Sequence, residues 1–529
     1  MLSHRSAINL AVPQYPARHT YDPVGRLANI FYPSSSTTVA ATPDVHFSYN
    51  SAGRVWTRTE DGQATTTYEY TTWGTPKKET VVSSNTAALP SSVVERTFDG
   101  YGRPDLLKVQ SGGATAPDVD YNFNGTTGLL GNVASDGRII TYGYNGVGPM
   151  PTSLTYAHSG TTLLSSSRPL NSAGLASGIT DSQSGTIFQS LTYSYAADRV
   201  SAVTRNHEQT QWLYGYDQRG QVTSADKKFL YPSEYVRGLE TDYTYDMTGN
   251  RTTKQQGGNG SYGGYSMRTT NYGTANALNQ YTAITHPWSG ASTWLDVSGQ
   301  RSYPTETITV NSQEAEYQQA AYVPYYSFRK ELLLTPTADQ RYADVTINSS
   351  YYGVLDSGKM YVPPATENPV YDADGNLLQD SRWIYRWDAE NRLVSQTPAI
   401  SGPAAGVGTQ TSIYHTYDGL ARRVCRRSVQ EVYQQTSPGV ISLVGTYTFS
   451  RSFTYDGWNM VQSLDSGSAF GNFNDSGTAA TRLSFVWGPD IGSHTHGHTS
   501  WQQAGGVGGL IAVLGTTATS CQLGCAKVG

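Results

Sequence analysis

The chain has 529 residues and a formal net charge of −5, and charged residues make up 15% of it, well below the roughly 25% of an average globular protein. Its 39 Tyr and 54 Gly residues favour short strands joined by turns, because Tyr is a strand former and Gly interrupts helices. This composition excludes a helical bundle and a coiled coil, and the lack of a long basic run argues against a nucleic-acid partner.

The sequence predicts no particular structure for the N-terminal segment, residues 1–20, which stays unassigned. It has a basic start and a broken apolar stretch from Ala7 to Val12, which is too weak for a signal peptide. No run of about 18 apolar residues occurs anywhere in the sequence, so no membrane span is expected. Three cysteines, Cys425, Cys521 and Cys525, are too few to hold a chain of this length together by disulfides, so stability must come from burial.

From residue 21 onward one short motif recurs along the chain. It consists of an aromatic residue, Asp or Asn, two variable residues, Gly, and then Arg, Asn or Gln. The clear copies contain Tyr21, Asp22, Gly25 and Arg26; Tyr49, Asn50, Gly53 and Arg54; Phe98, Asp99, Gly102 and Arg103; Tyr216, Asp217 and Gly220; Tyr245, Asp246, Gly249 and Asn250; and Tyr371, Asp372, Gly375 and Asn376. Looser copies begin at Tyr121, Trp387, Tyr417 and Tyr455.

Each copy of the motif predicts a β-hairpin. Alternating residues before the aromatic, such as Thr241 to Tyr245, predict a strand with rings on one face. The Asp or Asn side chain can accept hydrogen bonds from backbone N–H groups of the turn, and Gly supplies the positive φ that closes it. Because a lone hairpin is marginal in water, successive hairpins must stack. The motif therefore predicts a long, repetitive β-sheet over residues 21–285.

The motif is absent from residues 286–367, where three strand-like runs occur instead: Thr305–Val310, Tyr325–Leu332 and Tyr342–Ile347. Pro and polar residues separate the runs, and a segment of about eighty residues suffices for a small β-sandwich inserted into the repeats or capping them. Its aromatic residues have two uses open to them, core packing and contact with sugar rings. Repeats then resume over residues 368–484.

Residues 485–515 carry a second motif. Phe485–Asp490 reads Phe-Val-Trp-Gly-Pro-Asp, and a glycine-rich run follows from Ala504 to Ala512. This run lacks the Lys-Ser/Thr of a phosphate-binding loop and the glycine spacing of a dinucleotide site, so a structural role is expected. Together with the repeats over residues 21–285 and 368–514, it resembles the Rhs/YD-repeat family, whose core-associated region begins with similar segments.

In that family, which includes shell components of insecticidal toxin complexes and the repeats of teneurins, the hairpins form a strip of sheet that spirals into a hollow shell. The shell encloses a C-terminal polypeptide, often a toxin. The resemblance implies an all-β fold of stacked hairpins in a spiralling sheet, a partial shell, with a small inserted β-sandwich-like module. Residues 516–529 match nothing in the family, so a truncated chain is expected. About ten hairpins predict an incomplete strip with an unpaired, aggregation-prone edge.

Three features of the sequence are candidate sites for metal binding or catalysis. His494, His496 and His498 alternate and would share one face of a strand, where they could hold Zn²⁺ or Ni²⁺; a polar loop is the alternative, and no metal is assigned. The stretch Asp372–Asn376 superficially looks like a calcium loop, but its Gly stands at the fourth position rather than the sixth. The repeated Asp residues recur at every hairpin, whereas a glycosidase pair is unique. No catalytic residue and no cofactor is therefore expected.

The resemblance implies a non-enzymatic shell scaffold that encapsulates and delivers a C-terminal toxin or effector in bacterial competition or cell-surface contact. The cargo would be its main partner, with a secretion apparatus or surface glycans as further partners, and the protein would be secreted or held at the cell surface. Two other functions stay open: a carbohydrate-binding adhesin that uses the ring-rich strip and the inserted module, and a cell-wall-associated hydrolase.

Overall fold

A computed structural model of the chain describes residues 17–33, 35, 39–85, 89–146, 150–231, 233–258, 267–289, 292–319, 326–335, 342–402, 408–467, 482–488 and 509–515. Within these ranges the chain forms antiparallel strands joined by turns. The predicted all-β fold is thereby confirmed. No helix in the described part is long and apolar enough to cross a membrane.

The first and largest sheet contains 24 strands. They are β1 (Arg18–Tyr21), β2 (Leu27–Phe31), β3 (Val45–Tyr49), β4 (Val55–Glu60), β5 (Ala64–Tyr70), β6 (Pro76–Ser83), β7 (Ser92–Phe98), β8 (Pro104–Ser111), β9 (Ala114–Thr115), β10 (Val119–Phe123), β11 (Leu130–Ser135), β12 (Arg138–Tyr144), β13 (Pro151–His158), β14 (Thr161–Ser167), β15 (Gly178–Gln183), β16 (Thr186–Ala196), β17 (Arg199–Arg205), β18 (Thr210–Tyr216), β19 (Val222–Phe229), β20 (Tyr235–Tyr245), β21 (Arg251–Gly257), β22 (Arg268–Tyr272), β23 (Ile284–Thr285) and β32 (Thr366–Glu367). Most neighbours pair in chain order, and β32 joins through β23.

The second sheet contains ten strands, again paired in chain order. They are β33 (Val370–Tyr371), β34 (Leu377–Gln379), β35 (Trp383–Trp387), β36 (Leu393–Pro398), β37 (Gly408–Tyr417), β38 (Arg423–Ser437), β39 (Val440–Asp456), β40 (Asn459–Gly467), β41 (Arg482–Trp487) and β42 (Leu510–Gly515).

Between β23 and β32 the chain leaves the first sheet and forms two four-stranded sheets. One contains β24 (Trp288–Ser289), β25 (Ser292–Arg301), β28 (Glu316–Gln319) and β29 (Tyr326–Leu334), and the other contains β26 (Ile308–Val310), β27 (Gln313–Glu314), β30 (Tyr342–Ser349) and β31 (Gly353–Tyr361). Both sheets contribute side chains to one apolar core, which includes Ile308, Val310, Phe328 and Leu332. The insert thus has a core of its own.

A β-bulge recurs at the aromatic residue of the repeats. The register between paired strands shifts just before Tyr21, Tyr49, Tyr70, Phe98, Phe123, Tyr144, Tyr195, Tyr216, Tyr245, Tyr371, Trp387, Tyr417 and Tyr455. A bulge bends its strand and increases the local twist. Bulges repeated beside the same turn in successive hairpins therefore curve the whole sheet in one direction.

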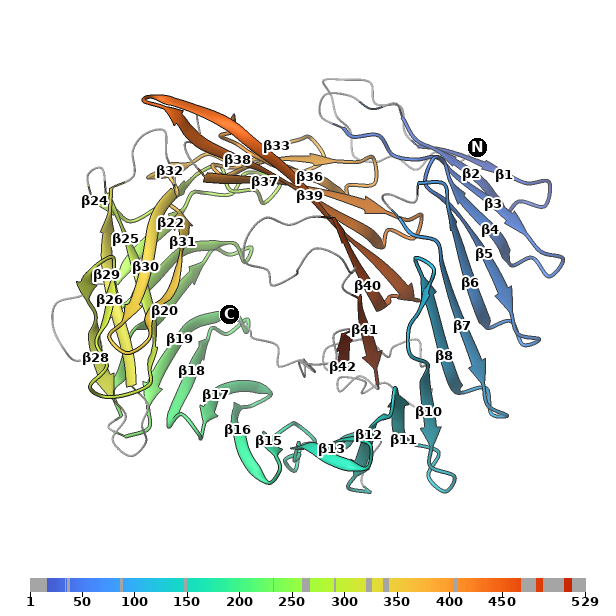
Figure 1. Ribbon diagram of the computed structural model, residues 1–529, viewed down its shortest axis with the longest axis horizontal. Helices are drawn as coiled ribbons and strands as arrows, with labels where there is room; N and C mark the ends of the chain where they lie inside the picture. The colour runs from blue at the N-terminus through green and yellow to red at the C-terminus, as the bar shows by residue number, and fades with distance from the viewer. Residues whose placement is uncertain are drawn as a thin grey trace.

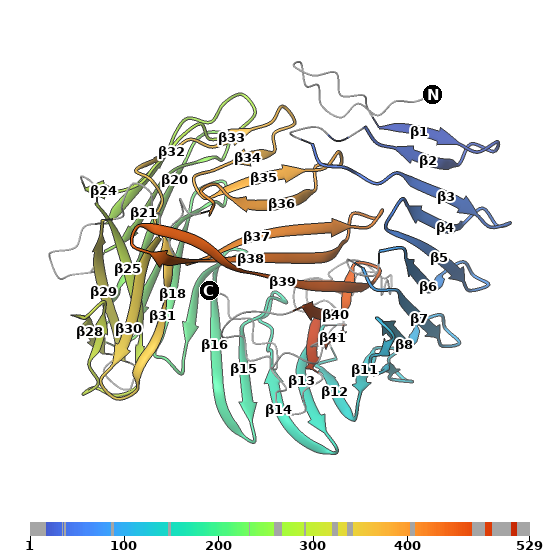
Figure 2. The ribbon, with the colours of Figure 1, turned by 45° about the horizontal axis from the view of Figure 1, so that its top comes forward.

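This curvature bends the strip into a ring (Figure 1). The first sheet runs from β1–β8 on the right of the view, through β11–β15 below, to β16–β22 on the left, where the insert lies beside it. The second sheet then crosses back, and the ends of β36–β39 meet the strands β3–β7 in both views (Figure 2). The sequence predicted an incomplete strip; the described strands curve far enough for the end of the strip to reach its beginning.

Candidate functional site at the seam of the ring

The repeated turn has one set of hydrogen bonds, illustrated by its first copy. Asp22 Oδ1 accepts hydrogen bonds from the backbone N–H groups of Val24 (3.0 Å) and Arg26 (2.8 Å). Its Oδ2 accepts a further bond from Arg26 Nε at 2.6 Å. Gly25 closes the turn at a φ of 85°, a conformation that glycine adopts without steric cost. The carboxylate thus holds the turn through three donors.

The same pair of backbone N–H bonds to one side-chain oxygen occurs at Asn50, Asp99, Asp217, Asp246, Asp372, Asp388 and Asp418. Burial raises the pKa of the Asp99 carboxyl, but the hydrogen bonds from Arg103 and Tyr101 outweigh it and leave the pKa below its ordinary value. The pKa of Asp246 is also lowered, chiefly by the side-chain hydrogen bond from Asn250. The carboxylates of Asp99 and Asp246 are thus stabilised in their charged form by their own turns.

In most repeats the aromatic residue fastens its hairpin to the preceding one through a hydroxyl or indole N–H group, which Phe98 and Phe123 lack. Tyr49 donates its hydroxyl to the backbone oxygen of Leu27 at 2.6 Å, and the Arg26 guanidinium lies 4.3 Å from the centre of the Tyr49 ring. The same donation to the strand after the previous turn is made by Tyr70, Tyr144, Tyr195, Tyr216, Tyr245, Tyr417, Tyr455 and, through indole nitrogens, Trp387 and Trp487. A ladder of identical contacts therefore runs along the strip.

Sequence reasoning missed three turns of this kind and misplaced one. Turns of the same form are built on Thr71, Asn171 and Asn276. The copy expected to begin at Tyr121 begins at Phe123, because Asn124 is the residue that accepts the turn hydrogen bonds. Asn279 takes the place of glycine with a φ of 59°. Asn followed three residues later by Gly or Asn was the signal that could have located two of them, the turns of Asn171 and Asn276.

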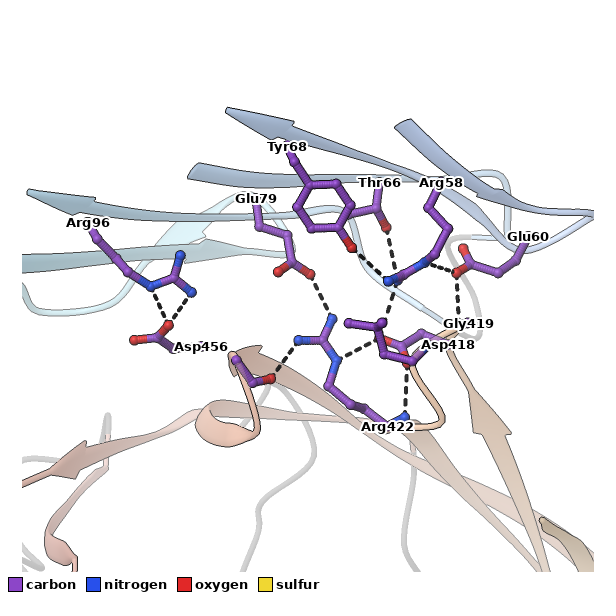
Figure 3. A network of polar contacts seen from close by, with 12 residues as sticks. Arg58, Glu60, Thr66, Tyr68, Glu79, Arg96, Asp418, Gly419, Arg422 and Asp456 are labelled. Atoms are coloured by element: carbon purple, nitrogen blue, oxygen red, sulfur yellow. Dashed lines mark hydrogen bonds and ion pairs between the residues drawn. The ribbon is translucent and has the colours of Figure 1, made fainter. Parts of the chain in front are cut away.

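Where the ring meets itself, motif turns of the second sheet contact strands β4–β7 of the first sheet (Figure 3). We call this contact the seam. Its centre is Arg58 on β4, which is only 1% exposed. Arg58 donates to Glu60 Oε1 at 2.5 Å and to the Tyr68 hydroxyl at 2.6 Å. Its Nη2 also lies 3.5 Å from Asp418 Oδ2 across the seam.

Arg422 crosses the seam in the opposite direction. Its Nε donates to Asp418 Oδ2 within its own turn, and its Nη2 donates to Glu79 Oε1 on β6, each at 2.7 Å. Burial lowers the pKa of Arg422, but the charges of Asp418 and Glu79 outweigh this effect and raise the pKa above its ordinary value. The backbone N–H of Gly419 adds a bond to Glu60 Oε1 at 2.8 Å. The charged groups at the seam are thus paired across it.

The turn between β39 and β40 uses its aspartate differently. Asp456 pairs with Asn459 in a tight hairpin, and both Nε and Nη2 of Arg96 on β7 contact its Oδ1 (Figure 3). The carboxylate that elsewhere holds a turn here binds the opposite sheet.

Backbone and apolar contacts complete the seam. Ala40 donates its N–H to the Trp387 oxygen at 2.8 Å, and Ala389 donates its N–H to Thr42 Oγ1 at 2.9 Å. A buried apolar cluster then combines side chains of both sheets, among them Val94, Leu107, Val109, Val133 and Ile140 of the first sheet and Val461, Val486, Ala512 and Leu514 of the second. Burial of apolar area therefore supports the ion pairs.

A cavity of about 590 Å³ remains between the two sheets at the seam. Its walls come from strands β3–β8 and β10 of the first sheet, from strands β40 and β41 of the second, and from the two turns that contain Leu420 and Trp458. Seven of the lining residues are aromatic: Phe47, Tyr68, Tyr70, Phe98, Tyr121, Trp458 and Trp487. Charged groups of the seam, including Glu79, Arg96 and Asp456, line it as well.

The described residues do not test the histidine metal candidate of the sequence, and they include one of the three cysteines. His494, His496, His498, Cys521 and Cys525 lie outside them. Within the described ranges no group of three or more His, Cys, Asp and Glu side chains could hold a metal ion. Cys425 is buried, and burial raises the pKa of its thiol to about 11, so the reactive thiolate is scarce at neutral pH.

The calcium-like stretch, Asp372–Asn376, forms an ordinary motif turn. Asp372 Oδ1 accepts the N–H groups of Asp374 (3.0 Å) and Asn376 (2.7 Å), and its Oδ2 accepts a bond from Asn376 Nδ2 at 2.9 Å. The carboxylate that a cation would need is therefore engaged with its own turn.

Comparison with known proteins finds no matching protein-family model and no matching curated protein. Solved TcdB2–TccC3 structures match weakly: TcdB2–TccC3–Cdc42 at 14% identity and a TM-score of 0.35, over 89% of this chain and 24% of that chain, and TcdB2–TccC3 without its hypervariable C-terminal region at 13% and 0.34, over 88% and 24%. A porin-like protein from Bacteroides uniformis matches at 13% and 0.15, over 52% of this chain and 93% of that chain. The chain spans about a quarter of the TcdB2–TccC3 chains, and likenesses this weak decide nothing about function.

Proposed function

We propose that the protein is a non-enzymatic shell scaffold, a curved wall of repeated hairpins that encloses and delivers a polypeptide cargo. The observation that carries the proposal is the seam, where Arg422 of the second sheet and Glu79 of the first form a buried ion pair at 2.7 Å. A sheet that only presented a binding face to solvent would have no need of such a joint. A wall that separates inside from outside requires one.

The recurring motif residues fit this role as structural parts. Their carboxylates accept hydrogen bonds from their own turns, and most of their aromatic residues donate a hydroxyl or indole N–H to the neighbouring hairpin. A catalytic carboxylate would instead need a raised or otherwise distinctive pKa in an open site. We infer that residues 21–285 and 368–484 build the wall, that residues 286–367 form an accessory module, and that residues 485–515 begin a region associated with the cargo.

The cargo in this proposal is a C-terminal toxin or effector domain, and the protein works outside the producing cell or at its surface. Enclosure would keep the cargo from proteases and from the producing cell until the wall opens. Numerous local contacts suit a wall that must persist outside the cell in a chain with only three cysteines.

Protection of an attached polypeptide tests the proposal. An unfolded, protease-sensitive reporter is fused after Gly529, and its cleavage by a broad protease is followed by gel. The proposal predicts slower cleavage than for the same reporter on an unrelated β-protein, and faster cleavage again when Glu79→Ala and Asp456→Ala weaken the seam. Equal cleavage rates in all three fusions would contradict enclosure.

A further inference from the structure

The seam cavity has walls of a particular chemistry. Trp458 stands at the tip of the turn between β39 and β40, lines the cavity and remains 72% exposed. Tyr70 lines it from the opposite sheet, and its hydroxyl is already bonded to the Val55 oxygen at 2.7 Å. Trp487 likewise uses its indole N–H on the Met460 oxygen at 2.7 Å. The polar atoms of Tyr70 and Trp487 are therefore engaged in the wall. The Arg54 guanidinium lies 5.5 Å from the centre of the Tyr70 ring, and Trp487 packs against the buried apolar cluster. The two residues therefore present only apolar ring surface to the cavity.

Two carboxylates that line the cavity each keep one oxygen without a hydrogen bond from the described residues. Both Arg96 nitrogens contact Oδ1 of Asp456, and Oδ2 has no bond of this kind. Arg422 donates to Oε1 of Glu79, and Oε2 likewise accepts no hydrogen bond from the described residues. Neither oxygen is among the buried polar atoms without a partner, so each can accept a hydrogen bond from water or from a ligand that displaces the water.

The charge of both carboxylates is already balanced by an arginine. A second cation is therefore not needed, and an anionic ligand would be repelled by the unbonded oxygens. Neutral O–H groups are the donors that fit. A pyranose ring combines such hydroxyls at its edge with apolar C–H groups on its face, and the latter stack on aromatic rings.

We propose that the seam cavity binds a short neutral oligosaccharide, which stacks on Trp458 and donates hydroxyl hydrogen bonds to Asp456 and Glu79. The cavity volume of about 590 Å³ lies within the range of small-molecule sites, which have apolar walls and a few placed polar groups. An entirely apolar ligand would leave both carboxylate oxygens unbonded, which is costly once water is displaced. The site stands independently of the shell proposal, because it needs only the two sheets in contact.

Ligand-detected NMR on the full chain tests the proposal. The probes are cellotriose, maltotriose and chitotriose at millimolar concentration, with glucuronic acid as the anionic comparison. We expect saturation transfer to at least one neutral trisaccharide and none to glucuronic acid. Trp458→Ala should weaken that binding by about tenfold or more. Trp73→Ala is the matched control, because Trp73 stands two residues after Thr71 as Trp458 stands two residues after Asp456, is 66% exposed and does not line the cavity.

The outcomes separate cleanly, and circular dichroism confirms that each variant is folded. Binding that is lost in Trp458→Ala and kept in Trp73→Ala supports the proposal. Binding that survives Trp458→Ala places the saccharide elsewhere and overturns it. Failure of all three neutral probes, or a cavity that instead takes up the uncharged apolar dye N-phenyl-1-naphthylamine with no saccharide bound, overturns it as well.

Discussion

Arg422 and Glu79 are 343 residues apart in the chain, yet Nη2 of the arginine lies 2.7 Å from Oε1 of the glutamate, and both side chains are buried. Asp418 holds the same guanidinium from its own turn at 2.7 Å. The repeated turn has therefore acquired a second role here, since its Asp–Arg pair also fastens the end of the strip to its beginning.

Removal of Glu79 should destabilise the protein more than removal of an exposed partner. Glu79→Ala leaves a buried guanidinium with one partner fewer, and breaking such a pair typically costs about 3–5 kcal/mol. Glu69→Ala, which breaks an exposed pair with Lys77, should cost less than about 1 kcal/mol. Urea unfolding of the two variants measures both values, and similar losses would speak against a buried seam.

The tyrosine ladder predicts a smaller effect. Tyr49→Phe keeps the ring and removes only the donation to the Leu27 oxygen, so we expect a loss of about 0.5–1.5 kcal/mol in the free energy of unfolding. Tyr101→Phe is the control, because Tyr101 is 86% exposed at a turn tip. An unchanged stability for Tyr49→Phe would show that the ladder bonds are replaced by water at no cost.

Two glycines of one turn separate conformational strain from steric contact. Gly102 has a φ of 77°, Gly100 has no positive φ, and an added Cβ meets nothing within 4 Å at either position. Gly102→Ala should therefore cost about 1–2 kcal/mol from the left-handed backbone alone, whereas Gly100→Ala should be close to neutral. Thermal unfolding of both variants checks the difference, and equal midpoints would refute the assigned turn geometry.

The contacts within each motif turn could be predicted from the sequence. Asp22, Gly25 and Arg26 interact within five residues, so their motif specifies their contacts. The seam could not be predicted, because the position of Asp456 opposite Arg96 depends on the bending summed over all the intervening hairpins. The turn at Asn276 was not recognised in the sequence because it has neither the aromatic residue nor the glycine of the motif. The ladder bonds were missed because a tyrosine that suits a strand face does not disclose where its hydroxyl points.

Acid should weaken the pairing of β23 with β32, where the chain leaves the first sheet for the insert and returns to it. His286 Nε2 lies 2.5 Å from Glu367 Oε1, and Ser381 donates to Oε2 of the same carboxylate. Burial raises the pKa of Glu367, but the hydrogen bonds from His286 and Ser381 outweigh it and hold the pKa below its ordinary value of 4.5.

A carboxyl whose pKa is lowered by folding contributes stability that is present above pH 4.5 and lost as the pH falls through the lower pKa of the folded state. The protection of the β23 and β32 amides against hydrogen exchange, measured relative to the intrinsic rate at each pH, should therefore decrease below pH 4.5 in the wild type. Glu367→Gln should exchange faster already at pH 7 and respond less to acid. If Glu367→Gln kept the full acid response of the wild type, another titratable group would be responsible for the effect.

Closure of the ring is the central claim, and disulfide trapping across the seam measures it most directly. Thr42→Cys and Ala389→Cys place two thiols where Ala389 N now lies 2.9 Å from Thr42 Oγ1, in a chain whose native cysteines are replaced by serine. We predict rapid, complete oxidation to an intramolecular disulfide, seen as a faster band on a non-reducing gel. The control pair Thr42→Cys and Ala373→Cys, with its second thiol on the turn between β33 and β34, should remain reduced. A Thr42–Ala389 pair that oxidises no faster than the control pair would show that the strip is open.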